Sequence, residues 1–235
     1  MTSPACQLYL VMPASTPQGS AKLAAALAGG PIACLLLTPG DEGQFDPAVT
    51  RPLVKLAQAK GVATLIADDI VNAKLLGADG VHLKEDPFSY DEARRTLGPK
   101  AIVGVEVGLS RHDAMELGER GADYVAFSDA GDDFDDEAAA PAAVDRHGDS
   151  DVDLIDQDVL DDVGRAMPDR IVWWAEVFTV PCVAWDVIRP EEAGELAALG
   201  VDFVALAPEA WLEAINPGAV IDTFAEAIGR GRPRS

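Results

Sequence analysis

Two acidic residues follow the ends of neighbouring predicted strands. Asp68 follows the apolar run 62–67, and Asp86 comes shortly after the run 79–83. The carboxyl ends of parallel strands meet at one end of a barrel, which we call the mouth, so both carboxylates are expected there, close enough to share a hard cation. Both residues also have structural interpretations, because Asp68 could cap the next helix and Asp86 could initiate the turn at Pro87. The residues alone leave both interpretations open.

Glu106 and His82 are candidates for acid–base catalysis. Glu106 ends the predicted strand 101–106. A carboxylate without a partner is costly there, so Glu106 is either exposed at the rim or functional. His82 alternates with Val81 and Leu83 on a buried strand. That pattern is typical of a core histidine, and the alternative is a general acid or base.

Trp185 and Arg189 are candidates for substrate binding near the end of the seventh predicted strand. Trp185 offers a surface for stacking, and Arg189 offers a contact for an anion. The helices that follow begin with Pro190-Glu191-Glu192 and Pro208-Glu209. Proline removes a backbone donor and the carboxylates occupy the positive end of each helix dipole. A phosphate at these helix ends would therefore meet like charge, of which Arg189 offsets only a part.

Apolar runs alternate with helical segments along the whole chain and predict the elements that hold these residues. Continuous apolar strands separated by helices indicate a parallel sheet covered on both faces. Eight units in 235 residues favour one (β/α)8 (TIM) barrel over a doubly wound open sheet. The predicted strands are 7–12, 32–37, 62–67, 79–83, 101–106, 122–127, 181–186 and 202–207.

Short motifs mark the boundaries between these units. Ser89 and Ser110 each precede an acid by three residues, as in a capping box, and predict two helix starts. The phrase Gly-Ala-Asp or Gly-Val-Asp recurs at 77–79, 121–123 and 200–202. Each copy closes a helix with glycine and opens a strand, which indicates a repeated βα unit.

Composition excludes several classes of protein. The chain has 18 Lys and Arg against 40 Asp and Glu, a net charge of −22, which repels nucleic acid and anionic membranes. No apolar stretch approaches the roughly 18 residues of a membrane span, and no basic region precedes an apolar one at the N-terminus. The three cysteines are far apart and lie in apolar runs. This pattern indicates buried thiols in a reducing compartment, so we expect a cytoplasmic protein. The N-terminal sequence predicts no targeting segment.

Much of the negative charge lies in one insertion after the sixth predicted strand. Residues 129–162 contain 14 Asp or Glu and one Arg. We expect a single barrel domain over 1–235 that carries a mobile acidic loop over 129–153, at or above the mouth. A charged surface loop that aids solubility explains this composition.

Four stretches resemble the thiamine-phosphate synthases and their relatives, the thiazole tautomerases. They are Leu8-YLVM, Leu65-IADD through Gly77-ADGVHL-Leu83, Ile102-VGV before Gly121-ADYVAF, and Trp173-WAEVFTVPCVAW. The resemblance implies a transferase of thiamine biosynthesis that joins a pyrimidine pyrophosphate to a thiazole phosphate and releases pyrophosphate. It further implies a carbocation-like pyrimidine intermediate, Mg2+ held by Asp68 and by Asp86 or, alternatively, Glu85, a phosphorylated small-molecule substrate and a homodimer.

Several site motifs of that family are changed in this chain, which indicates a degenerate active site. The Asn of the strand-three pair Asn-Asp is lost at Ala67, and Lys84-Glu85-Asp86 is one residue shorter than the family's Gly-Gln-Glu-Asp. The basic residues of the family's second strand are replaced at Cys34-LLL, and the serine that ends its fifth strand is replaced in Gly104-Val105-Glu106. The glycines that follow its seventh strand are replaced in Trp185-Asp186-Val187-Ile188.

Three functions remain open at this point. The first is thiamine-phosphate synthesis through Asp68, Asp86 and rewired anion contacts. The second is an inactive barrel of the same ancestry that binds or regulates a partner, through the acidic loop. The third is a related enzyme with a less anionic substrate, for which Glu106 and His82 are the acid–base candidates.

Overall fold

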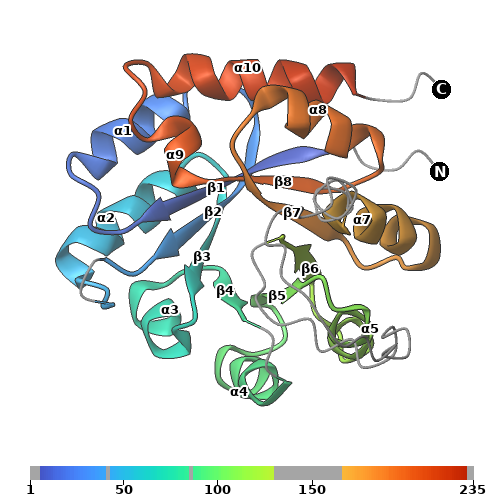
Figure 1. Cartoon of the computed structure of the whole chain (residues 1–235). Helices are drawn as coiled ribbons and strands as arrows, with labels where there is room; N and C mark the ends of the chain where they lie inside the picture. Colours follow the sequence, from blue (N-terminus) through green and yellow to red (C-terminus); the bar gives the residue numbers. More distant parts are fainter. Residues whose placement is uncertain (1–5, 41–42, 85–86, 130–165, 232–235) are drawn as a thin grey trace, which may run out of the picture.

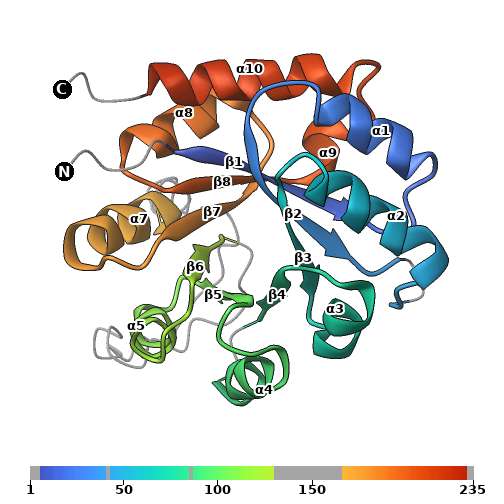
Figure 2. The ribbon, with the colours of Figure 1, turned by 180° about the vertical axis from the view of Figure 1, so that it is seen from behind.

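The structure, a computed structural model, describes residues 6–40, 43–84, 87–129 and 166–231. Eight parallel strands form a closed barrel in the chain order β1 to β8, so the predicted (β/α)8 barrel is confirmed. Figures 1 and 2 show the helices around the outside of the strands from opposite sides. The last helix, α10 (Pro217–Arg230), lies across α1 (Gly19–Ala26) and α8 (Pro190–Ala198).

The remaining elements follow the predicted alternation closely. The strands are β1 (Gln7–Pro13), β2 (Ile32–Thr38), β3 (Ala63–Ala67), β4 (Gly80–Leu83), β5 (Ile102–Gly108), β6 (Tyr124–Phe127), β7 (Cys182–Val187) and β8 (Phe203–Leu206). The other helices are α2 (Pro47–Gln58), α3 (Ile70–Leu76), α4 (Pro87–Leu97), α5 (Arg111–Glu119), α7 (Ala166–Val177) and α9 (Pro208–Trp211).

One of the two predicted capping residues is confirmed and the other is wrong. The Ser110 side chain accepts a hydrogen bond from the Asp113 backbone N–H at 3.2 Å, as a helix N-cap does. Helix α4, in contrast, begins at Pro87, so Ser89 lies inside its first turn. Proline is well suited to a first helical position because its missing N–H has no partner there anyway.

The apolar side chains form two separate clusters. The smaller one fills the inside of the barrel, and the larger one packs the strands against the surrounding helices. Cys34 lies in the inner cluster and Cys182 in the outer one, and burial raises the pKa of both thiols to about 12. Trp174 is 1% exposed in the outer cluster, as expected for an aromatic residue of a helix packed on the barrel.

The repeated Gly-x-Asp phrase is a structural clamp at the amino end of the barrel. In each copy the Asp carboxylate accepts the backbone N–H of a residue at or near the start of the preceding strand. The pairs are Asp79 with Thr64 at 2.8 Å, Asp123 with Val103 at 2.8 Å, and Asp202 with Cys182 at 2.9 Å. The glycine that opens each phrase has a positive φ, which permits the sharp exit from the helix. The phrase therefore stabilises the fold at the end opposite the mouth.

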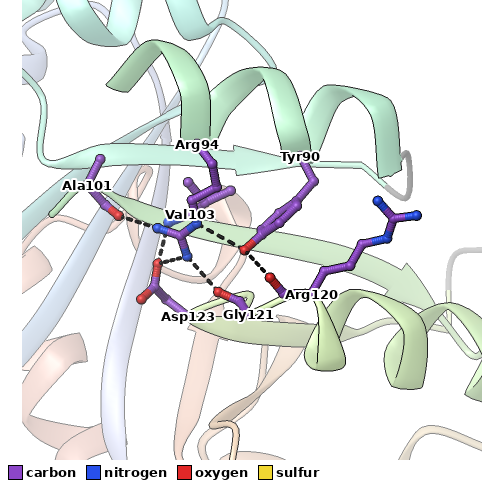
Figure 3. Close-up of polar contacts among 7 residues, drawn as sticks. All are labelled: Tyr90, Arg94, Ala101, Val103, Arg120, Gly121 and Asp123. Atoms are coloured by element: carbon purple, nitrogen blue, oxygen red, sulfur yellow. Dashed lines mark hydrogen bonds and ion pairs between the residues drawn. The ribbon is translucent and has the colours of Figure 1, made fainter. Parts of the chain in front are cut away.

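Two of the three clamps receive a second support from a helix. Gln58 at the end of α2 donates to the Gly77 carbonyl and to Asp79, at 2.9 and 3.1 Å. Arg94 in α4 does the same for Gly121 and Asp123, at 2.7 and 2.6 Å (Figure 3). Figure 3 shows that Arg94 also reaches the Ala101 carbonyl, which ties α4 to the starts of β5 and β6.

The predicted acidic loop lies outside the described residues except for Asp129, so its placement stays a prediction. Asp129 accepts a hydrogen bond from the Met167 backbone N–H at 3.1 Å. The chain therefore leaves β6 and enters α7 at neighbouring points. In the described part of the chain no helix has the length and apolarity that a membrane crossing requires.

Candidate active site at the mouth of the barrel

Asp68 stands at the mouth, immediately after β3, in a backbone conformation that is uncommon for residues other than glycine. Its φ is +52°, in the left-handed region. Its side chain is exposed, and Oδ1 accepts a hydrogen bond from the Lys84 backbone N–H at 3.0 Å. Among the described residues no hydrogen bond engages Oδ2. The capping interpretation of Asp68 is wrong, because Asp69 caps α3 by accepting from the Asn72 N–H at 2.7 Å.

Asp186 has the same left-handed backbone conformation on the other side of the barrel. It lies near the end of β7, at an irregularity in the pairing with β8, and its φ is +57°. Strained backbone at a strand end persists only where the surroundings impose it, and it is common at functional sites. Partial desolvation raises the pKa of the Asp186 carboxyl, and the charges of Glu106 and Glu209 raise it further. Glu106, Asp186 and Glu209 therefore make this part of the mouth negative.

Glu106 has favourable contacts despite this field. Its side chain is 24% exposed, and its Oε1 accepts a hydrogen bond from the Ser128 hydroxyl at 3.0 Å. The His82 imidazole, the Ser128 hydroxyl and the Lys84 ammonium lower the pKa of Glu106 more than burial raises it. Glu106 is thus a carboxylate at neutral pH. The expectation that it is rim-exposed or functional stays a prediction, and its geometry allows both.

His82 lies below Glu106 inside the barrel and is 3% exposed. Its Nδ1 is 2.8 Å from the Tyr124 hydroxyl, which is 3.0 Å from the Tyr9 hydroxyl. Its Nε2 is buried with no hydrogen-bond partner and lies 3.9 Å from Glu106 Oε2. The structure therefore brings together the two predicted acid–base candidates. His82 lies on β4 and Glu106 lies on the adjacent strand β5.

Trp185 is buried inside the barrel, whereas Arg189 is exposed at its mouth. Trp185 is 9% exposed, and its ring stacks on His82 with the ring centroids 4.4 Å apart. It fixes the imidazole from inside the barrel and offers little open surface to a ligand. Arg189 is exposed as the N-cap residue of α8, and its Nε lies 3.6 Å from Glu192. Asp86 lies outside the described residues, so its pairing with Asp68 stays a prediction.

Sequence reasoning did not single out four residues of this site: Tyr9, Tyr124, Ser128 and Asp186. A signal was available for the tyrosines, because each occupies an inward position of a buried strand, where a hydroxyl must find a partner. For Asp186 the signal was weaker. The sequence shows an acid at a strand end but not the positive φ that exposes it.

We expect Asp186→Asn to stabilise the protein at pH 7 by about 0.5 kcal/mol, a small gain because water screens charges that reach solvent. Asparagine tolerates the left-handed backbone and removes the repulsion from Glu106 and Glu209. The folded-state pKa of Asp186 is raised, so its penalty is present at high pH and is relieved as pH falls through that value. Urea unfolding at pH 7 and pH 3.5 measures this difference.

The control for this prediction is Asp222→Asn on an exposed turn of α10. It makes the same change of charge on an outer helix, away from the acids of the mouth. An Asp186→Asn protein that is less stable than the wild type at pH 7 would show that the carboxylate makes a favourable contact.

Comparisons with known proteins agree with this architecture. The family model described as thiamine monophosphate synthase matches residues 8–133. The thiamine-phosphate synthase of Rhodospirillum centenum is 38% identical over 224 residues, covering 93% of this chain and 96% of the relative. That of Erythrobacter litoralis is 35% identical over 226 residues, covering 94% and 95%.

Solved structures show the same fold. A thiamine phosphate pyrophosphorylase from Pyrococcus furiosus superimposes with a TM-score of 0.69 at 18% identity, over 96% of both chains. The 3-hexulose-6-phosphate synthase of Salmonella typhimurium gives 0.66 at 15% identity, over 96% of this chain and all of that one. The two named synthases match nearly end to end by sequence, and the family model matches more than half of the chain. This chain therefore belongs to the thiamine-phosphate synthase family.

Proposed function

We propose that this protein is a thiamine-phosphate synthase, a transferase that joins a pyrimidine pyrophosphate to a thiazole phosphate and releases pyrophosphate. The nearly full-length similarity to named synthases supports the reaction class. The observation that carries the proposal is Asp68. Its carboxylate is exposed at the mouth, oriented through Oδ1 by the Lys84 N–H, and held in a strained backbone conformation.

The residues at the mouth fit Mg2+. A hard cation prefers oxygen ligands, and Asp68 presents a carboxylate oxygen to solvent. Asp68 would hold the ion together with Asp86, which is predicted to lie at the same rim. When bound, Mg2+ supplies positive charge that lets a pyrophosphate approach an acidic mouth. In this site, the positive charge that binds the pyrophosphate therefore comes more from the cation than from basic side chains.

The chain's own carboxylates have a second task in this reaction. A pyrimidine that loses pyrophosphate develops positive charge, and preorganised negative groups stabilise such charge in a partly desolvated site. Glu106 and Asp186 supply that field at the carboxyl ends of β5 and β7. The thiazole phosphate contacts Arg189, whose guanidinium is exposed beside the start of α8.

The charges at the helix ends favour one alternative. Helices α8 and α9 begin with proline and carry Glu191, Glu192 and Glu209 in their first turns. These acids oppose a free phosphate at a position where backbone donors would otherwise bind one. An enzyme of the same ancestry with a less anionic substrate is the second candidate.

The test is to incubate the full-length protein with Mg2+, the pyrimidine pyrophosphate and the thiazole phosphate, and to detect thiamine phosphate by mass spectrometry. Asp68→Asn keeps a side chain that tolerates a positive φ but removes the charge. We expect the rate to fall by at least about 10- to 100-fold, because changes to groups that only support the ligands of a metal already cost that much. Asp222→Asn should leave the rate unchanged.

The outcomes separate the candidates. Absence of product with the wild-type protein at high concentration would overturn the synthase assignment and favour a different substrate or an inactive, partner-binding barrel. Product formed equally well by Asp68→Asn would remove Asp68 from the cation site while keeping the activity.

A further inference from the structure

Five polar side chains form one line through the inside of the barrel, which we call the axial chain. In order they are Tyr9, Tyr124, His82, Glu106 and Ser128, contributed by β1, β6, β4, β5 and the residue after β6. Successive polar atoms are 3.0, 2.8, 3.9 and 3.0 Å apart. Three of these separations are hydrogen bonds, and the gap between His82 Nε2 and Glu106 Oε2 is the exception.

That gap is unusual for a buried ring nitrogen. His82 Nε2 has no hydrogen-bond partner in the described structure, although the ring is 3% exposed. An orphan polar atom in an apolar interior costs free energy, so it calls for a functional explanation. At 3.9 Å the space is too small for a water to bridge and about 1 Å too long for a direct bond. A small movement of Glu106 would close it.

The charge of Glu106 decides where a neutral His82 carries its proton. Burial raises the pKa of both tyrosine hydroxyls well above the ordinary value, so they stay protonated and can orient either way. A proton on Nδ1 would leave a bare Nε2 lone pair facing a carboxylate. A proton on Nε2 faces that carboxylate favourably, and Nδ1 then accepts from Tyr124, which accepts from Tyr9.

We propose that His82 is a positioning residue that carries its proton on Nε2 and, with the Ser128 hydroxyl, orients the Glu106 carboxylate to accept an N–H of the ligand at the mouth. The tyrosines hold the ring from below, and Trp185 holds it by stacking. Hydrogen bonds at such sites are often long in the free protein and tighten when a ligand is bound. Ligand binding therefore closes the gap between Nε2 and Glu106.

The ligand class follows from the acceptors. Glu106 and Asp186 present acceptor oxygens in a negative field, which suits a ligand that donates N–H bonds from an amino group. This part of the inference rests on the proposed function, in which the first substrate is a pyrimidine. The position of the proton on His82 does not depend on it.

The first experiment measures that proton directly. Two-bond 1H–15N spectra of the histidine-labelled full-length protein at pH 8 distinguish the two neutral tautomers, and His82→Asn assigns the signal among the three histidines. We expect the Nε2–H form, and an Nδ1–H form would overturn the proposal. Glu106→Gln should convert the signal to a mixture of tautomers. A signal unchanged in Glu106→Gln would overturn the coupling between the two residues.

The second experiment tests the ligand contact without turnover. 4-Aminopyrimidine is titrated into protein with 13C-labelled glutamate carboxyl groups, and pyrimidine, which lacks the amino donor, is the matched probe. We expect the Glu106 signal to shift with the amino compound alone, and less so in Ser128→Ala. Equal shifts with both probes, or none with either, would overturn the ligand assignment. A retained shift in a protein that makes no thiamine phosphate would reject the synthase function but not this site.

Discussion

Replacing Gly104 with alanine is expected to destabilise the barrel by about 3 kcal/mol or more, at the upper end of overpacking effects. A Cβ added at Gly104 would fall inside the Tyr124 ring, which lies directly over this glycine of β5. The ring cannot retreat without losing its hydrogen bonds to Tyr9 and His82. Urea unfolding of the wild type and the variant measures the loss.

Two further variants make this prediction specific. Gly229→Ala adds a Cβ in α10 where nothing lies within 4 Å, and it should stabilise the protein by up to about 1 kcal/mol because alanine is the better helix former. In a Tyr124→Ala background the space is free, so Gly104→Ala should cost less than about 1 kcal/mol. Equal costs in both backgrounds would show that the Tyr124 ring is not the obstacle.

The barrel could be predicted from sequence because burial on both faces leaves a strong local signal in every strand. The run 7–12 became β1 (Gln7–Pro13), and the run 202–207 became β8 (Phe203–Leu206). Errors at the helix starts arose where two residues competed for one local role. Pro87 rather than Ser89 begins α4, and Asp69 rather than Asp68 caps α3.

The axial chain could not be predicted, because it is set by the register between distant strands. Tyr9 and Tyr124 are 115 residues apart, and their hydroxyls meet only because of the stagger with which the strands close the barrel. No spacing within one strand contains that information. Alternation does show that both residues point inward, so a search for buried hydroxyls in need of partners would have found them.

The burial of Trp185 is a second feature of the site that the sequence did not predict. Its place near the end of the seventh strand suggested an open stacking surface, yet the inward position on β7 buries the ring against His82. Which end of a strand a residue occupies is readable from sequence. The depth at which its side chain stops depends on the residues that share the barrel interior with it, among them Ala67 and Ala126.

Arg94→Met is expected to lower the free energy of unfolding by about 3 kcal/mol while leaving the mouth intact. The guanidinium donates to the Tyr90 hydroxyl, to two backbone carbonyls and to Asp123 (Figure 3). Methionine keeps most of the apolar stem but removes the guanidinium donor from all four acceptors in a partly buried site, where Asp123 retains its hydrogen bond from the Val103 N–H. The loss arises at the amino end of β5 and β6, far from Glu106.

The adjacent residue offers a matched control for Arg94. Arg95 is exposed, and its NH2 lies 3.8 Å from Glu92, so Arg95→Met should change stability by less than about 0.5 kcal/mol. The His82 tautomer signal should be the same in both variants and in the wild type, because the axial chain contains neither arginine. Similar stability losses for the two variants would mean that charge, and not the four directed hydrogen bonds, accounts for the role of Arg94. A large loss for Arg94→Met alone, with the tautomer unchanged, would show that the clamp at the amino end and the chemistry at the mouth are separable parts of one barrel.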